Sequence, residues 1–253
     1  MDSFIDLQNI IKDIEKTSNF KLIIGKSVKN KPIFAFHFGK FDAPQILLTA
    51  STHAREYVST AVGYEMIKVC SFKDKGVWFI PLVNPDGVEI VLSKKQRNFK
   101  ANSNLVDINV NFDANWGQGE KNVFQPHFEN YVGPRPESEI ETRTLTNFTR
   151  RLSPHFVINF HTKGEVIYFG DFLKDENKGK DNILASQISN ITGFSKIKTS
   201  GSFGGFSDWC EMSQNIPAVT VELGCDNLPH PIPLSQTNSI MSKLKNLLDK
   251  ITI

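Results

Sequence analysis

Hydrophobic residues follow two spacings along this chain. Apolar runs of strand length occupy Lys21–Val28, Pro32–Gly39, Gln45–Ala50, Val77–Val83, Phe156–Phe160 and Ala218–Leu223. Helical spacing occupies residues 1–18, through Phe4, Leu7, Ile11 and Ile14, and then Glu56–Cys70, Glu137–Leu152, Asp181–Ile191 and Leu234–Ile251. This alternation predicts an α/β fold, with a twisted, mixed but largely parallel β-sheet covered by helices on both faces.

Turn signals divide these elements. Lys29-Asn30-Lys31 joins the first two strand-like runs as a hairpin, and Asn84-Pro85-Asp86-Gly87 closes the fourth run as a turn. A long irregular stretch, residues 93–136, is rich in Asn, Gly and Pro. Loops of this length inside a compact domain are usually functional or disordered. We therefore expect one domain over residues 1–253, with an N-terminal helix at 1–18 and an active-site loop region at 93–136.

Composition narrows the class of protein. The chain has 253 residues, 40% of them apolar, and its 20 phenylalanines supply a sizeable core. A net charge of +2 with interspersed signs argues against a dedicated nucleic-acid binder. No apolar stretch approaches the length of a membrane span, and the N-terminus lacks the apolar core of a signal peptide, so we expect a cytoplasmic protein. Cys70, Cys210 and Cys225 are widely spaced and are expected to be free thiols.

Three candidate functional residues lie where strands are predicted to end. His53 follows the run Gln45–Ala50, His161 follows Phe156–Phe160, and Glu222 lies near the end of Ala218–Leu223. Ligands gather at the carboxyl ends of the strands in such sheets. His53 also forms a His-x-x-Glu pair with Glu56, which taken alone favours a charged surface loop over a metal site.

Two histidines and one carboxylate are the usual protein ligands of a hydrolytic zinc ion, and the reaction needs a further carboxylate as base. Glu222 is the natural candidate for that base. The other histidines fit a site less well, because His37 lies inside a strand, His155 begins the run that His161 ends, and His127 and His230 lie in proline-flanked loops. No His-Glu-x-x-His or Gly-x-Ser-x-Gly motif is present, and Cys225 lacks the surroundings of a thiol protease nucleophile.

Several short motifs resemble one family in content and in order. They are His53-Ala-Arg-Glu56, Asn84-Pro-Asp-Gly87, Phe99-Lys-Ala-Asn102, Val106-Asp-Ile-Asn109, Asn111-Phe112, Phe160-His161, Gly204-Gly-Phe-Ser-Asp-Trp209 and Thr220-Val-Glu-Leu223. Each is weak to moderate alone, and the ordered set over residues 20 to 250 resembles the zinc carboxypeptidase-like peptidases, of which carboxypeptidase A is the type.

The resemblance implies a role for each matched residue. His53, Glu56 and His161 would bind one zinc ion, and Glu222 would be the general base. Asp107 would orient the first zinc histidine. Lys100 falls where many members have an arginine that stabilises the oxyanion, a task that Arg97 nearby would be able to share. Arg55 and Asn109 match substrate-contacting positions, and Ser207 matches the side chain that lines the specificity pocket.

Departures from the family pattern bear on the substrate. Val110 stands where family carboxypeptidases carry an arginine that grips the terminal carboxylate of the substrate. Ser200 stands at the position of the mobile substrate tyrosine, and the polar Ser207 disfavours a large apolar group in the pocket. Classical C-terminal trimming is therefore not expected.

Two stretches resemble one branch of the family in more detail. They are His161-Thr-Lys-Gly-Glu-Val-Ile-Tyr168 and Gly204–Trp209 followed by Pro217-Ala-Val-Thr-Val-Glu222. They are similar to bacterial γ-D-glutamyl-L-diamino acid endopeptidases, which implies a peptidoglycan stem peptide or muropeptide as substrate. Arg55, Lys163 or Arg135 would then hold the carboxylates of the diamino acid. The alternatives are a carboxypeptidase or amidase with another substrate, and a catalytically silent zinc-binding module.

Overall fold

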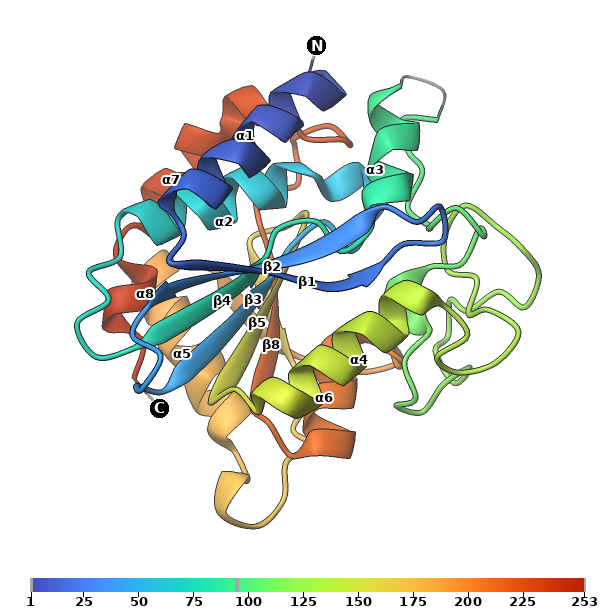
Figure 1. The fold of residues 1–253 in the computed structure, drawn as a ribbon. Helices are drawn as coiled ribbons and strands as arrows, with labels where there is room; N and C mark the ends of the chain where they lie inside the picture. The colour runs from blue at the N-terminus through green and yellow to red at the C-terminus, as the bar shows by residue number, and fades with distance from the viewer. Residues whose placement is uncertain (1, 94–95, 253) are drawn as a thin grey trace.

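An eight-stranded mixed sheet forms the centre of the computed structural model, which describes residues 2–93 and 96–252 (Figure 1). Residues 94 and 95, within the expected loop region 93–136, and residues 1 and 253 lie outside the described residues. The strands are β1 (Phe20–Lys26), β2 (Pro32–Gly39), β3 (Gln45–Thr49), β4 (Gly76–Ile80), β5 (Phe156–His161), β6 (Val166–Phe169), β7 (Ser195–Lys198) and β8 (Ala218–Glu222). Their order across the sheet is β1-β2-β4-β3-β5-β8-β6-β7.

The centre of the sheet is parallel. β4, β3, β5 and β8 run in one direction, whereas β2 is antiparallel to β4, and β6 is antiparallel to β8. All five residues of β4 and all six of β5 are buried, as expected for strands covered on both faces. His161 pairs with Glu222 in the register of β5 and β8. The carboxyl ends of β3, β5 and β8 therefore meet at one edge of the sheet.

Helices cover both faces of the sheet (Figure 1). They are α1 (Phe4–Thr17), α2 (Val58–Lys68), α3 (Pro85–Leu92), α4 (Ile140–Leu152), α5 (Lys180–Thr192), α6 (Phe206–Gln214), α7 (Thr237–Leu244) and α8 (Leu247–Lys250), with 3-10 turns η1 (Ala54–Glu56), η2 (Ile108–Val110), η3 (Asp175–Asn177) and η4 (Leu234–Gln236). One large apolar core lies beneath α1, α2, α5, α7 and α8, and a second lies beneath α4 and α6. The predicted α/β class and mixed sheet are confirmed.

Three helical predictions and one turn prediction needed correction. The stretch Glu56–Cys70 is helical only from Val58, because Glu56 belongs to the 3-10 turn η1. The predicted closing helix Leu234–Ile251 is divided into η4, α7 and α8, since Asn246 adopts a left-handed conformation with φ of 62°. Asn84 does not close a turn but caps α3, its side chain accepting a bond from Gly87 N.

Several elements carried too little pattern to be predicted. β6 and β7 have four residues each, and all four residues of β7 are exposed. α6 begins directly after two glycines, a pattern that is typical of a loop rather than of a helix start. The fourth correction concerns Glu137–Leu152, where the helix begins at Ile140 rather than at Glu137.

The described part of residues 93–136 contains η2 and an isolated bridge between Val123 and Tyr131. Backbone hydrogen bonds join it to the segments before α6 and around His53: Phe112 N donates to Gly204 O at 3.0 Å, and Ala54 N donates to Lys100 O at 3.1 Å. Among residues 2–93 and 96–252, no helix is both long enough and apolar enough to cross a membrane.

Candidate metal centre and active site

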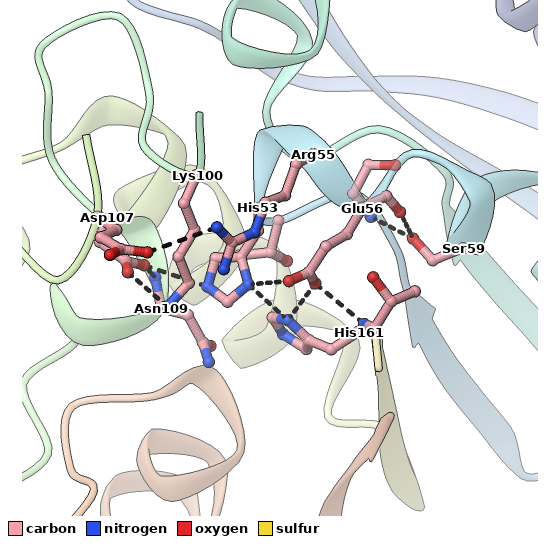
Figure 2. A network of polar contacts seen from close by, with 12 residues as sticks. His53, Arg55, Glu56, Ser59, Lys100, Asp107, Asn109 and His161 are labelled. Carbon is pink, nitrogen blue, oxygen red and sulfur yellow. Dashed lines mark hydrogen bonds and ion pairs between the residues drawn. The ribbon is translucent and has the colours of Figure 1, made fainter. Parts of the chain in front are cut away.

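His53, Glu56 and His161 converge at the edge where the parallel strands end (Figure 2). His53 Nδ1 lies 2.9 Å from Glu56 Oε1, and His161 Nδ1 lies 2.9 Å from both Glu56 Oε2 and His53 Nδ1. One ligand atom from each residue lies within 4.8 Å of the others, and all three side chains are buried. The structure thus brings together the three residues that the sequence nominated as ligands.

Local backbone structure places these side chains. His161 is the last residue of β5, whereas His53 and Glu56 lie in the tight connection between β3 and α2. Ser59 holds that connection from the first turn of α2, since its hydroxyl donates to Glu56 O at 2.6 Å and accepts from Ser51 N at 3.0 Å. The 3-10 turn η1 directs Glu56 back toward His53, three residues earlier.

Lys100 and the buried Asp107 form an ion pair beside His53 (Figure 2). Asp107 Oδ2 lies 2.8 Å from Lys100 Nζ, and Asp107 Oδ1 lies 3.2 Å from His53 Nε2. Burial alone would raise the pKa of Asp107, but Lys100 and His53 hold that pKa well below its usual range. Burial would likewise lower the pKa of Lys100, yet Asp107 raises it, so both groups are charged.

Asn159 supports His161 in the same manner, and the sequence analysis missed it. Its amide lies 2.9 Å from His161 Nε2 and 2.6 Å from Thr49 Oγ1. In the structure Asn159 Nδ2 faces His161 Nε2, and Asn159 Oδ1 accepts from the Thr49 hydroxyl. Rotating the amide by 180° exchanges two atoms of similar size, and in that orientation Oδ1 accepts the proton of Nε2 and leaves the Nδ1 lone pair free. Thr49 is able to take the other end of the amide, because a hydroxyl both donates and accepts. A polar residue inside the apolar run Phe156–Phe160 was the available signal.

This donor set fits a zinc ion. Both imidazoles turn Nδ1 inward, and Nε2 lies 3.2 Å from Asp107 Oδ1 in His53 and 2.9 Å from the Asn159 amide in His161, the positions from which outer partners orient a metal-binding imidazole. Burial alone would raise the pKa of Glu56, but the two imidazoles hold it well below its usual range, so Glu56 is a carboxylate. Two imidazoles and one carboxylate are the ligands of many catalytic zinc sites.

Glu222 lies beside this cluster at the end of β8. Burial, reinforced by the negative charge of Glu56, raises the pKa of Glu222 to about 7, while His161, Lys100 and Arg55 act in the opposite direction. Its Oε2 atom has no hydrogen-bond partner among the described residues. A carboxylate with a pKa near neutrality and a free oxygen is suited to take up and release a proton.

A cavity of about 520 Å³ opens between the cluster and the N-terminus of α6. The site residues that line it are His53, Lys100, Asn109, Ser207 and Glu222, together with Val110 and Ser200. Asn109 Oδ1 accepts a bond from Phe206 N at 3.1 Å, which joins η2 to α6. Tyr168 of β6 also lines the cavity and was not anticipated from the sequence.

The remaining basic candidates lie outside this cavity. Arg55 donates to Asn98 O at 3.1 Å and approaches Glu129. Lys163 is bound to the backbone oxygens of Asp226 and Leu228.

Arg135 is exposed and donates to Pro136 O. Arg97 lines a separate small pocket together with His230, so the structure does not place it beside Lys100. His37 contacts Gln45, and His127 contacts the backbone of Glu129, both away from the cluster.

The sequence profile of zinc carboxypeptidases matches residues 8–241. The chain belongs to the zinc carboxypeptidase family. Membership accounts for the fold and for zinc as the expected metal of the His53–Glu56–His161 cluster. In this chain, Glu56 and His161 lie 105 residues apart in sequence and are brought together by the parallel pairing of β3 and β5.

Two bacterial relatives with named activities are similar to this chain. The chain is 27% identical over 254 residues to γ-D-glutamyl-L-diamino acid endopeptidase 1 of Lysinibacillus sphaericus, with 86% of this chain and 63% of that protein covered. It is also 27% identical over 205 residues to murein peptide amidase A of Escherichia coli, with 78% of each covered. The chain thus spans somewhat under two thirds of the length of the first relative.

A solved structure with the same fold is that of bovine thrombin-activatable fibrinolysis inhibitor in complex with tick carboxypeptidase inhibitor. Its TM-score is 0.81 at 22% sequence identity, over 96% of this chain and 94% of that one. This likeness establishes the architecture of the sheet and its covering helices.

Proposed function

We propose that this zinc carboxypeptidase family member hydrolyses the γ-D-glutamyl–diamino acid bond of peptidoglycan stem peptides or muropeptides. The observation that carries the proposal is the buried His53–Glu56–His161 cluster beside a cavity that His53 and Glu222 line. The names of the Lysinibacillus endopeptidase and the Escherichia coli murein peptide amidase support this substrate class.

His53, Glu56 and His161 would hold one zinc ion. Zinc in such a site lowers the pKa of a bound water and polarises the substrate carbonyl. Glu222 would take a proton from the attacking water as the new carbon–oxygen bond forms. It would then give that proton to the amide nitrogen as the carbon–nitrogen bond breaks, which completes hydrolysis.

Lys100 would stabilise the negative charge that develops on the carbonyl oxygen. Its ammonium group lies in the cavity wall and stays charged through Asp107, 2.8 Å away. Asp107 would therefore have two roles, because it keeps Lys100 charged and also orients His53. Arg55 is not among the residues that line the cavity, and its Nη1 donates a hydrogen bond to Asn98 O at 3.1 Å.

Val110 supports cleavage of a bond other than the C-terminal peptide bond. It lines the cavity where the family resemblance places a carboxylate-gripping arginine. An aliphatic side chain makes no ion pair with a terminal carboxylate, so the chain lacks the usual means of selecting a free C-terminus at that position.

The test is to incubate the purified protein with disaccharide tripeptide and tetrapeptide, with and without a metal chelator. Mass spectrometry should show release of the diamino acid fragment, and the chelator should abolish it. If the zinc-loaded protein leaves both muropeptides intact, the proposed substrate is wrong. Peptides with free and amidated C-termini distinguish a carboxypeptidase, whose cleavage would be lost on amidation.

A further inference from the structure

Lysines are the basic side chains that line the active-site cavity in the described chain, and their surroundings differ. Lys100 Nζ lies 2.8 Å from Asp107 Oδ2, and Lys198 Nζ lies 2.5 Å from Asp171 Oδ2. Lys121 is exposed, and its ammonium group makes no ion pair or hydrogen bond with any described residue. Lys121 is therefore the cation of the cavity wall that is left to pair with a ligand.

Backbone contacts fix the segment that carries Lys121. Glu120 N donates to Gly201 O at 2.9 Å. Gly201 has a positive φ of 68°, and a Cβ atom at this position would lie 2.6 Å from Glu120 Oε1, so only glycine allows the two segments to approach so closely. Lys121 is thus held next to residues 199–202, which line the same cavity.

The acidic side chains of the cavity wall do not pair with Lys121. Glu120, Asp208 and Glu222 line the cavity, and none of them forms an ion pair with Lys121 within the described chain. Asp208 belongs to the first turn of α6, and Glu222 belongs to the end of β8. An ammonium group has three hydrogens to donate, so Lys121 is able to bind a carboxylate of a ligand.

A substrate carboxylate needs such a partner in this cavity. Val110 lines the wall where the family resemblance places a carboxylate-gripping arginine, and the basic residues suggested by the sequence, Arg55, Lys163 and Arg135, do not line it. Diaminopimelate has a carboxylate at each end of its chain, and the distal one is free in both stem tripeptides and tetrapeptides. Removing this charge from water costs free energy unless a cation pairs with it.

We propose that Lys121 binds the distal carboxylate of the diamino acid that the reaction releases. This inference rests on the proposed function, in which that diamino acid occupies the cavity beside Glu222. The cavity volume of about 520 Å³ is in the range of small-molecule sites. Lys121 thereby favours diaminopimelate over lysine, which has the same carbon chain and both amines but lacks the distal carboxylate.

The test compares two stem tripeptides, one ending in meso-diaminopimelate and one ending in lysine. The zinc-loaded wild type should favour the diaminopimelate peptide in kcat/KM by about fivefold or more, since solvent weakens but does not abolish an ion pair at an exposed lysine. Lys121→Met should reduce this preference to near unity, and Lys121→Arg should retain most of it because the positive charge remains. A preference in Lys121→Met within about twofold of the wild-type value would overturn the inference and leave the proposed function intact.

Lys198→Met is the matched control, because it removes one positive charge from the same cavity wall. Since Lys198 is already paired with Asp171, this variant should keep the preference for diaminopimelate. An equal loss of preference in Lys198→Met and Lys121→Met would overturn the inference, because it would assign the selection to the overall charge of the cavity.

Calorimetry with free diaminopimelate and free lysine measures carboxylate binding without any cleavage. The zinc-loaded wild type should bind diaminopimelate more tightly than lysine, and Lys121→Met should bind the two alike. Failure of the wild type to cleave any muropeptide would refute the proposed function. Equal affinities of the wild type for the two amino acids would separately overturn the inference.

Discussion

Replacing Asn159 with leucine tests whether a residue that touches no substrate controls the metal site. Leucine has a similar volume but neither donates nor accepts a hydrogen bond. The substitution removes the 2.9 Å contact with His161 Nε2 and the 2.6 Å contact with Thr49 Oγ1, both of which are buried. His161 then loses the partner that holds its tautomer and the direction of its ring.

Two effects follow, and they are measured separately. Loss of an outer partner of a metal ligand costs about 10- to 100-fold in metal affinity, which corresponds to about 1.4–2.8 kcal/mol. The buried hydroxyl of Thr49, left unpaired, destabilises the metal-free protein by about 1–3 kcal/mol. Zinc affinity is measured by competition with a chromophoric chelator, and stability is measured by denaturant unfolding without metal.

Asn159→Asp is the matched control, because a carboxylate keeps the acceptor for Nε2. We expect it to bind zinc at least as tightly as the wild type, although the buried charge lowers its metal-free stability. A purely structural role for Asn159 would affect unfolding in both variants and leave zinc affinity alone. Zinc affinity of Asn159→Leu within about twofold of the wild type would refute the role given to Asn159.

Two further predictions concern charged groups. Lys100→Met should retain zinc but lose about 10²- to 10³-fold in kcat, as for loss of an oxyanion donor, and unchanged turnover of the zinc-loaded variant would exclude Lys100 from that role. Burial, with the charge of Asp181 adding to it, raises the pKa of Glu211 from 4.5 to about 8. The folded state then binds the extra proton, so the free energy of unfolding should fall as pH rises from about 4.5 to about 8. Glu211→Gln should flatten this decline in denaturant unfolding series, and an identical pH slope in both proteins would contradict it.

The predicted strand ends were enough to place His161, a candidate metal ligand, beside Glu222, the candidate base. Buried parallel strands place their last residues at a common edge, so His161 and Glu222 were expected as neighbours, and their pairing in β5 and β8 confirms this. Periodicity alone did not locate Glu56, because three-residue 3-10 turns are too short to show a pattern. The motif resemblance nominated it instead.

The residues that hold the metal ligands in place were harder to predict, because their contacts depend on the register between neighbouring strands. Asn159 faces Thr49 across the β3–β5 pairing, and it shares a strand face with His161 because side chains alternate. Register cannot be deduced from one strand considered alone. The contact between Ser207 and Thr220 in the cavity wall has the same origin, since their hydroxyls meet only when α6 packs on β8.

The most direct test of the account compares zinc content and muropeptide hydrolysis in the wild type and in Glu222→Gln. Glutamine preserves the size of the side chain but cannot accept the proton of the attacking water. Because Glu222 is not one of the three ligands, the variant should bind one equivalent of zinc and lose most of its turnover. A zinc-loaded Glu222→Gln protein that hydrolyses muropeptide as fast as the wild type would contradict the mechanism.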